Sequence, residues 1–314
     1  MAQPTNTYDS YDAVGNREDL ADVIYNISPT ATPFQTMAKR AKATNILHEW
    51  QTDSLASAST SNAVIDGDDA TTDAMVATTR LNNRTQISDK VVLISGSQEA
   101  ANTAGRKSEM AYQTAKSAKE LKRDMEAILT GSQAKVAGNS TTARKAASLE
   151  SWIKTNSSFG AGGADPTGDG SDTRTDGTQR AITEDMLKEV LREAFASGGE
   201  PNTLMVGPFN KQKVSGFTGG ATRMDKSEDM KLYAAIDVYR SDFGEVKVVP
   251  NRFQRDRTAF PLQSDMWAIA YYRPFRSHEL AKTGDSQRRQ ILVEYTLEAR
   301  QEASSGVIAD LLTT

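Results

Sequence analysis

Residues 103–130 make up the longest helical pattern in the sequence. The stretch contains no proline, and its only glycine, Gly105, lies in the expected first turn. Small and apolar residues recur along it at steps of three and four: Ala111, Ala115, Ala118, Leu121, Met125 and Ile128. Gly131 follows where a left-handed residue commonly ends a helix. At 1.5 Å per residue, about 26 helical residues span roughly 39 Å. The fold must therefore accommodate one long amphipathic helix whose first half offers only alanine for packing.

The charge balance limits the possible functions. The 314 residues carry 37 Lys and Arg against 41 Asp and Glu, a formal net charge of −4. This argues against a dedicated nucleic-acid-binding protein, which usually has a basic surplus. The sequence has no cysteine, which excludes disulfides and thiolate metal sites. It also lacks a membrane-length apolar run and the features of a signal peptide. We expect a soluble cytoplasmic protein of two domains, or of one elongated domain.

The first 42 residues predict an arm of short elements on extended tethers. Asn16 caps a short helix over residues 17–27, with its apolar residues on one side. Pro29 and Pro33 favour an extended path after it, and a second helical piece is expected over residues 34–42.

Residues 43–96 predict strands that enclose a long polar loop. Strands are expected over 46–55, 76–81 and 85–95, whereas 55–74 is almost wholly Ser, Ala, Thr, Asp and Asn. A loop of about twenty residues exceeds the usual connection inside a compact domain. Such a loop is either disordered or held by something outside its own subunit.

The remaining sequence predicts a mixed domain and then antiparallel strands, which makes the fold class α+β. Leu149, Trp152 and Ile153 form an apolar edge, and the Gly/Asp-rich residues 159–179 are expected to be mobile and solvent-facing. Further elements are expected in this order: a helix after Thr183, a strand over 203–207, a helical piece over 208–217, a hairpin over 234–250 with its turn at 241–244, strands over 265–282, and a long strand over 287–302.

No catalytic, cofactor-binding or metal site emerges from the motifs. His48 and His278 are the only histidines and no HExxH is present, so a zinc hydrolase is not expected. The nucleophile-elbow and P-loop patterns are also absent. Gly160, Gly162 and Gly163 do not lie between a strand and a helix, so they are no dinucleotide fingerprint.

Two weaker patterns concern ions. Asp165, Thr167, Asp169, Gly170 and Asp176 occupy five positions of a calcium loop, but two ligand types differ and helical flanks are missing. A solvated loop is the preferred interpretation. Arg252, Arg255 and Arg257 form a basic cluster, for which an exposed strand end or an intersubunit ion pair is favoured over a phosphate site.

Four segments resemble the major capsid proteins of tailed bacteriophages, which have the Hong Kong 97 fold, in the branch similar to the coat protein of phage SU-ten. Residues 7–34 resemble the N-terminal arm of these proteins. The segment RLNNRTQIS resembles the return strand of their extended loop, and ARKAASLESWIKTN resembles the segment after their spine helix. The segment SDFGEVKVVPNR resembles a strand pair of their axial domain. These short matches are spread along most of the chain, from residue 7 to residue 252.

The resemblance implies a shell protein without an active site or cofactor. Its expected parts are an N-terminal arm (1–42), an extended loop (43–96), a peripheral domain with the spine helix (97–150), an axial domain (151–261) and returning strands that are mainly peripheral (262–314). The arm and loop would clasp neighbouring subunits of hexamers and pentamers in an icosahedral head around double-stranded DNA, which the wall contacts non-specifically.

Further partners follow from the same resemblance: a portal, with scaffold or cement proteins as additional possibilities. No scaffolding segment precedes the arm, which implies a separate scaffold or none. Some relatives join subunits through a loop lysine, but no lysine lies between Lys42 and Lys90. Assembly is expected in the host cytoplasm, and the protein in the virion. Two alternatives remain: an encapsulin compartment, which shares the fold, and an α+β enzyme with unrecognised acid–base carboxylates.

Overall fold

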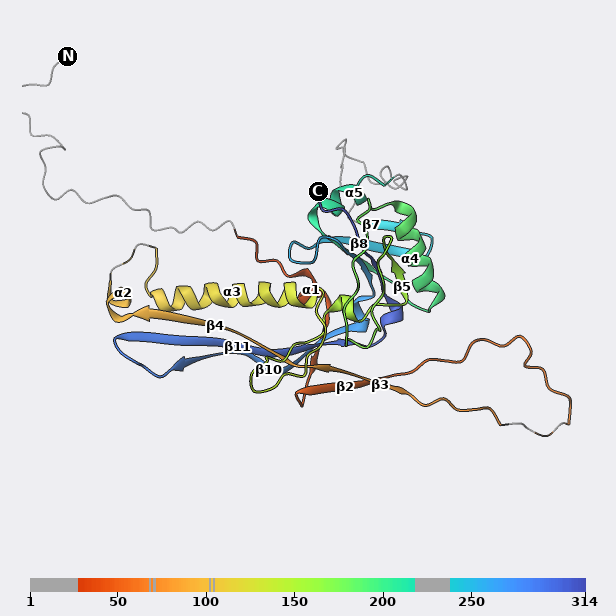
Figure 1. The fold of residues 1–314 in the computed structure, drawn as a ribbon, viewed down its shortest axis with the longest axis horizontal. Helices are drawn as coiled ribbons and strands as arrows, with labels where there is room; N and C mark the ends of the chain where they lie inside the picture. The colour runs from red at the N-terminus through yellow and green to blue at the C-terminus, as the bar shows by residue number, and fades with distance from the viewer. Residues whose placement is uncertain (1–27, 68, 70–71, 102, 104, 218–237) are drawn as a thin grey trace, which may run out of the picture.

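The computed structural model describes residues 28–314 except for 68, 70–71, 102, 104 and 218–237. The chain forms two sheets, one long helix and a projecting hairpin, which together give an elongated molecule (Figure 1). The helix predicted over 17–27 and the first residues of the hairpin predicted over 234–250 lie outside the described residues. The α+β class predicted from the sequence is confirmed.

A four-stranded sheet runs along the molecule under the long helix α3, Glu109–Leu129. Its strand order is β1 (Lys39–Lys42), β10 (Trp267–Leu280), β11 (Ser286–Ala299) and β4 (Gln86–Ser95). Strands β10, β11 and β4 are antiparallel neighbours, whereas β1 runs parallel to β10. The short helix α2 (Gly96–Ala100) follows β4 at the far end of this sheet (Figure 1).

Helix α3 begins six residues later than predicted. Gly105 has a φ of 74°, and Ser108 is the N-cap, whose hydroxyl accepts a hydrogen bond from the Ala111 N–H at 3.1 Å. The 21 residues span about 32 Å at 1.5 Å per residue. The expected apolar stripe is buried at Leu121 and Met125, but Ala111 is exposed.

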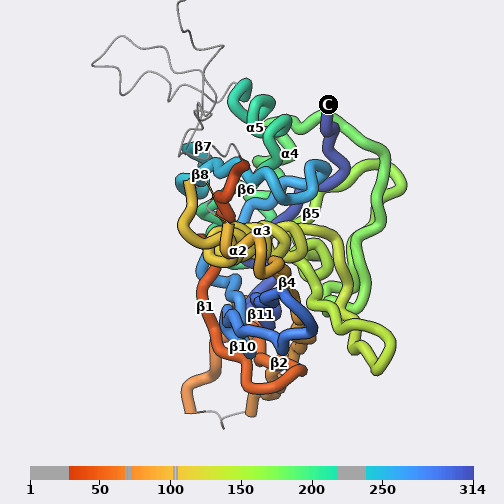
Figure 2. Tube along the Cα trace, turned by 90° about the vertical axis from the view of Figure 1, so that its left-hand side faces the viewer, coloured from red at the N-terminus to blue at the C-terminus, as the bar shows by residue number. Residues whose placement is uncertain are grey.

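A six-stranded sheet lies on the other side of α3 (Figure 2). Its order is β5 (Asn156–Ser158), β12 (Gly306–Ile308), β9 (Ala259–Leu262), β6 (Thr203–Val206), β8 (Gly244–Pro250) and β7 (Val238–Ser241). Helices α4 (Glu184–Ala196) and α5 (Pro208–Val214) pack on one face. The three short strands β5, β9 and β12 were not predicted. Among the described residues, short 3-10 helices complete the elements: η1 (Leu149–Ser151), η3 (Ser264–Met266) and η4 (Glu302–Ser304).

One hydrophobic core joins the two sheets. It includes Leu121 of α3, Tyr295 of the four-stranded sheet and Phe260 of the six-stranded sheet, together with Trp152. Trp152 and its neighbours Leu149 and Ile153 are fully buried, so the predicted apolar edge is confirmed. A second core lies on the face of the six-stranded sheet that is turned away from the main core. Helices α4 and α5 cover this face.

The start of the described chain belongs to the core and not to a free arm. Residues 34–42 were predicted to be helical, but helix α1 covers only Pro33–Met37 and strand β1 follows it. Phe34 is fully buried in the main core, and Ala38 packs there as well. Residues 33–42 therefore pack within their own subunit, and the predicted arm on extended tethers does not include them. The reason is that β1 finds a partner in β10, far away in the sequence.

The Gly/Asp-rich segment 159–179 is also held by its own subunit. Ala164 and Thr175 exchange backbone hydrogen bonds of 3.0 and 3.1 Å. The buried Asp310 carboxylate accepts hydrogen bonds from the N–H groups of Gly160 and Gly177. Most residues of the segment are exposed, as predicted, but these hydrogen bonds hold it in place, and its composition did not reveal the distant partners.

Candidate intersubunit surfaces

The hairpin formed by β2 (Leu47–Thr52) and β3 (Thr79–Arg84) is anchored at its base. The indole N–H of Trp50 donates to the Ala299 carbonyl at 2.7 Å, and its ring lies 5.3 Å from that of Trp152. The buried Asn83 side chain donates to the Leu297 carbonyl at 2.8 Å and accepts from the Ala147 N–H at 2.9 Å. The base of the hairpin is thus fixed to the main core.

His48 also helps to fix the base of the hairpin. Its described contacts do not form a catalytic constellation. Its Nε2 lies 3.0 Å from a carboxylate oxygen of Glu298. The hydrogen bond from His48 lowers the pKa of Glu298 below its ordinary value, with Arg300 contributing in the same direction. The other histidine, His278, is exposed on β10. The structure therefore does not bring the two histidines together.

The loop between β2 and β3, residues 53–78, is uncovered by the rest of the subunit in its described residues. All of its described residues are exposed. They include five large apolar side chains that are 76–98% exposed: Leu55, Val64, Ile65, Met75 and Val76. The charged residues of the loop are all aspartates: Asp53, Asp66, Asp68, Asp69 and Asp73. The loop is thus an acidic segment with uncovered apolar groups.

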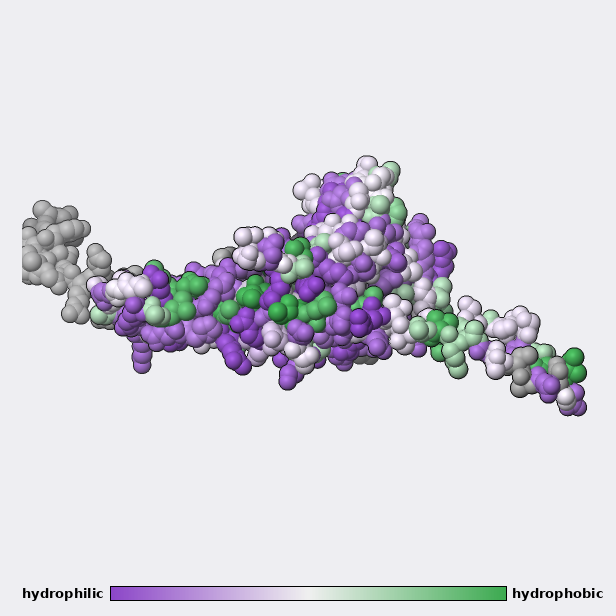
Figure 3. Space-filling model, turned by 60° about the horizontal axis from the view of Figure 1, so that its bottom comes forward, coloured by the Kyte–Doolittle hydropathy of each residue, from purple (hydrophilic) through white to green (hydrophobic). Residues whose placement is uncertain are grey.

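A second uncovered apolar surface lies on the four-stranded sheet, on the face away from α3. Strand β4 points Val92 and Ile94 inwards, while Ile87, Val91 and Leu93 are 45%, 53% and 56% exposed. Figure 3 shows green patches along this underside, with further patches on the hairpin loop. Sequence reasoning missed this surface, although the run VVLI, with apolar residues on both faces, predicts that both faces become covered.

The strand register adds positive charge to this outer face. Residues directly opposite in an antiparallel ladder share a face. Leu93 is opposite Arg288 of β11, which is opposite Leu280 of β10, and Leu292 is opposite Arg276. The outer face therefore combines apolar side chains with arginines and one aspartate, Asp89, which is opposite Leu292. We use the name outer sheet face for the surface of the residues Ile87, Asp89, Val91, Leu93, Arg276, His278, Leu280, Arg288, Gln290 and Leu292.

A buried carboxylate connects α1, α3 and the six-stranded sheet. Glu126 is fully buried and accepts hydrogen bonds from the N–H groups of Phe34 and Gln35 at 2.7 and 3.1 Å. The side chains of Gln35 and Asn251 donate to it at 3.1 and 2.8 Å. Burial raises the pKa of Glu126, and these hydrogen bonds partly oppose that shift. Glu126 acts as the cap that α1 lacks from its own residues.

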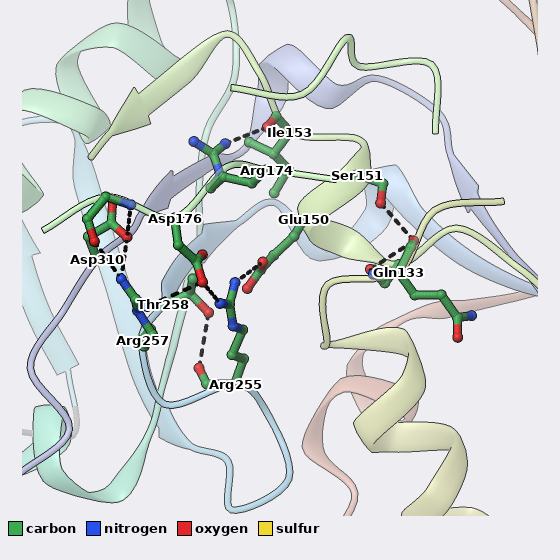
Figure 4. A network of polar contacts seen from close by, with 12 residues as sticks. Gln133, Glu150, Ser151, Ile153, Arg174, Asp176, Arg255, Arg257, Thr258 and Asp310 are labelled. Carbon is green, nitrogen blue, oxygen red and sulfur yellow. Dashed lines mark hydrogen bonds and ion pairs between the residues drawn. The ribbon is translucent and has the colours of Figure 1, made fainter. Parts of the chain in front are cut away.

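The predicted arginine cluster separates into internal ion pairs (Figure 4). Arg255 lies between Glu150, at 2.9 Å, and Asp176. Arg257 contacts Asp176 at 3.2 Å and Asp310 at 2.9 Å. Both favoured interpretations, an exposed strand end and an intersubunit ion pair, are therefore wrong for Arg255 and Arg257. Their partners come from residues 150, 176 and 310, a proximity that sequence spacing could not indicate.

The residues of the partial calcium loop also have separate partners. Asp165 pairs with the buried Arg174 and accepts a hydrogen bond from the Ser157 hydroxyl. Asp176 forms ion pairs with Arg255 and Arg257. Asp169 accepts hydrogen bonds from Thr167 and from the N–H of Ser171.

The described residues include neither a metal-binding cluster nor a membrane-spanning helix. No group of three or more His, Cys, Asp or Glu side chains in this part of the chain is arranged to hold a metal ion. Within the same part, no helix combines the length and the apolar character required to cross a bilayer.

Comparisons with known proteins agree over nearly the whole length. The family model described as SU10 major capsid protein matches residues 3–312. The major capsid protein of Escherichia phage Phieco32 is 26% identical over 344 residues, which cover 98% of this chain and 97% of that protein.

The solved structures show the same fold. The capsid asymmetric unit of cyanophage A-1(L) gives a TM-score of 0.66 at 14% identity, over 98% of this chain and 99% of that one. The holo-SrpI encapsulin complex of Synechococcus elongatus PCC 7942 gives 0.57 at 11% identity, over 95% and 93%. At these identities the likeness concerns the fold alone, and it confirms the predicted Hong Kong 97-type capsid fold. Because the family model covers almost every residue, the chain belongs to the SU10 major capsid protein family and is a major capsid protein of a tailed phage.

Proposed function

We propose that the shell forms by head-to-tail contacts, in which the acidic loop 53–78 of one copy covers the outer sheet face of the next. The observation that carries this proposal is the position of the two surfaces. The loop projects from one end of the molecule, whereas β4 and the β10–β11 turn reach the opposite end (Figure 1). A loop at one end cannot cover the surface at the other end of its own subunit, so a second copy must supply it.

The two surfaces are complementary in chemistry. The loop supplies aspartates and exposed apolar side chains such as Val64 and Ile65. The outer sheet face supplies Arg276 and Arg288 beside Val91 and other apolar residues. Opposite charges around an apolar centre favour association and fix its register. The extended loop can in addition contribute backbone hydrogen bonds along an exposed strand edge.

The geometry of this contact leads to rings. An interface between two different patches of identical subunits is heterologous, and it closes into a ring when the rotation between copies permits. Hexamers and pentamers are such rings, and together they can tile an icosahedral shell. In this assignment residues 43–96 are the extended loop and 97–150 the peripheral domain with its spine helix. Residues 151–261 are the axial domain, and 262–314 return mainly to the peripheral domain.

The remaining partners belong to the same proposal. The shell encloses double-stranded DNA, which its wall contacts non-specifically, and it joins a portal and, where present, scaffold or cement proteins. It assembles in the host cytoplasm and catalyses no reaction. Subunits are held by non-covalent contacts, since the loop offers no lysine for a covalent link.

Replacing residues 56–72 with a short Gly-Ser turn tests the proposal. Loop-closure entropy changes by only about 0.6 kcal/mol per doubling of length, so the subunit should fold. Specific interfaces usually bury about 1,200–2,000 Å², so removing the clasping loop should prevent closed shells. Circular dichroism melting and sedimentation velocity on one preparation measure both properties.

Two results would contradict the assignment of the loop. Normal shells would show that the loop is only a tip without an assembly role, and an unfolded subunit would show that it belongs to the core. A matched control replaces Ser57, Ser59 and Ser61 with glycine at unchanged loop length and should assemble. Electron microscopy and the nucleic-acid content of wild-type particles separate a DNA-filled head from an encapsulin-like compartment.

A further inference from the structure

A cationic hollow lies on α3, on the side of the helix away from the four-stranded sheet. Its volume is about 160 Å³. Lys116, Lys119 and Arg123 line it, with Glu120 as the acidic residue of the lining. Tyr112 and Ser28 contribute to the walls as well. The hollow thus gathers three positive charges against one negative charge.

Helical spacing places these cations opposite the core. At about 100° per residue, Lys116, Lys119 and Arg123 fall within roughly 60° of one another on the helix circumference. Leu121 and Met125, which are buried in the main core, lie on the other side of the helix. The cations therefore face away from the protein interior.

The charges of the hollow are not neutralised within the described subunit. Lys90, which approaches α3 from β4, pairs with Asp124 at 2.8 Å. By contrast, neither Lys116 nor Lys119 has an ion-pair partner in the part of the chain that the structure describes. Arg123 stacks over the Phe253 ring at 5.2 Å, and its Nε is buried without a hydrogen-bond partner among the same residues. A chain with a net charge of −4 thus keeps a cationic surface on α3.

We propose that this cationic hollow is the place where the shell wall contacts phosphate groups of the packaged duplex DNA, an inference that rests on the proposed function of the shell. Lysine binds phosphate as a point charge without reading bases, which suits contact with any sequence. Three cations per subunit are few against one phosphate charge per about 1.7 Å of duplex. Each contact is therefore weak, and DNA can still move along the wall during filling.

The assignment also orients the subunit in the shell. The cationic hollow and the outer sheet face lie on opposite sides of the α3–sheet layer. If α3 faces the lumen, the outer sheet face with Val91 and Leu93 lies on the side away from the DNA. The acidic loop of a neighbour would then cross the outside of the wall, where its aspartates do not meet phosphates.

Amine labelling of intact particles tests the contact directly. DNA-filled heads and heads emptied of DNA are treated with a small amine-reactive ester, and modified lysines are quantified by mass spectrometry. Lys116 and Lys119 should react several-fold less in filled heads. Lys188, whose side chain is 52% exposed on α4, should react equally in both. Equal labelling of Lys116 and Lys119 in filled and emptied heads would overturn the proposal.

Charge-removing variants of the full chain give a second measurement. Unassembled subunits carrying Lys116→Gln and Lys119→Gln are compared with subunits carrying Lys188→Gln and Lys282→Gln, which lose the same charge. The slope of log affinity for a short duplex against log salt should fall by about 1.8 in the first pair, since each phosphate contact contributes about 0.9. An unchanged slope, or the same fall in both pairs, would contradict the proposal.

A third variant separates DNA from another acidic occupant, the chain's own N-terminal stretch. Residues 1–27 carry five acidic side chains against one arginine. Neutralising Glu18, Asp19 and Asp22 should leave duplex affinity unchanged. If this change raises the affinity for duplex DNA while the Lys116→Gln and Lys119→Gln variant leaves it unchanged, the N-terminal stretch fills the hollow. The assignment of the hollow to DNA is then wrong. Particle formation is scored separately, because closed shells with unaltered DNA contact would refute this inference and leave the proposed function intact.

Discussion

Replacing Glu126 with glutamine tests whether one buried carboxylate holds the N-terminal segment to the rest of the subunit. One carboxylate oxygen accepts from the Phe34 N–H and the Asn251 side chain, and the other accepts from the backbone and side chain of Gln35. Glutamine has a single carbonyl oxygen, so its NH₂ group must face one of these two pairs of donors. At least two donors then lose their acceptor.

The expected loss of stability follows from these donors. An unsatisfied buried donor costs about 1–3 kcal/mol, so two donors cost about 2–6 kcal/mol. Removal of a buried charge offsets part of this, because an ion in the interior is itself costly. We expect the free energy of unfolding of the Glu126→Gln subunit to fall by about 2–4 kcal/mol.

Urea unfolding of the full-length subunit measures this change. The matched control is Glu120→Gln, two turns earlier on the same helix and partly exposed, which should change stability by less than about 0.5 kcal/mol. Limited trypsin digestion should cut faster at Lys39, Arg40 and Lys42 of β1 in the Glu126 variant, since α1 and β1 are adjacent. Equal stability of the two variants would refute the role of Glu126 as the cap of α1.

The pH dependence of the same comparison has a definite sign. The pKa of Glu126 in the folded protein is raised above the ordinary value of 4.5 by burial. A raised pKa contributes stability that is fully present below the unfolded pKa and is lost as pH rises through the folded pKa. The stability difference between wild type and Glu126→Gln should therefore be largest near pH 4.5 and shrink as pH rises. A difference that widens with pH would show that the hydrogen bonds outweigh the burial.

Three further outcomes follow from the structure. Leu121→Pro, in the middle of α3, should cost about 3 kcal/mol or more from the backbone alone and give insoluble subunits without shells, so normal particle yield would contradict a continuous packed helix. Boiled particles should run as a 34.1 kDa monomer without reducing agent, because the sequence has no cysteine and no lysine within 43–89, whereas a covalent ladder would contradict this. Arg255→Gln leaves the buried Glu150 without its cation and should cost about 3–5 kcal/mol in urea unfolding, while Arg252→Gln, at an exposed residue, should be nearly neutral.

Much of the fold could be predicted because its long elements follow strong periodic patterns. The N-cap residue Thr183 correctly marked the start of α4, and the long strand predicted over 287–302 is β11, in which the alternating Ile291, Val293, Tyr295, Leu297 and Ala299 are buried. These signals are local, so they can be recognised in a single sequence. The start of α3 was predicted six residues too early, because Gly105 was placed in the first turn, whereas the hydroxyl of Ser108 caps the helix.

The errors arose where a distant partner decides the local structure. Residues 39–42, KRAK, have helical propensity, but pairing with residues 268–271 of β10 makes them a strand. The glycines and aspartates of 159–179 suggest a free loop, but Asp310 and Arg257 hold them in place. The outer sheet face was missed for the same reason. The exposure of Val91 depends on how β4 pairs with β11, and this pairing cannot be read from the sequence of β4 alone.

The distribution of buried and uncovered apolar groups gives the subunit two mechanical parts. The main core contains residues of both sheets and of α3, so relative motion of the sheets would open contacts between fully buried side chains such as Tyr295 and Phe260. The loop 53–78 has no such contacts, and its base is fixed by Trp50 and Asn83. In the proposed shell of pentamers and hexamers, some part of the subunit must adapt to different neighbours. Adaptation of the loop disturbs no core contact, whereas adaptation of the body breaks many, so we expect the variation between environments to fall on the loop.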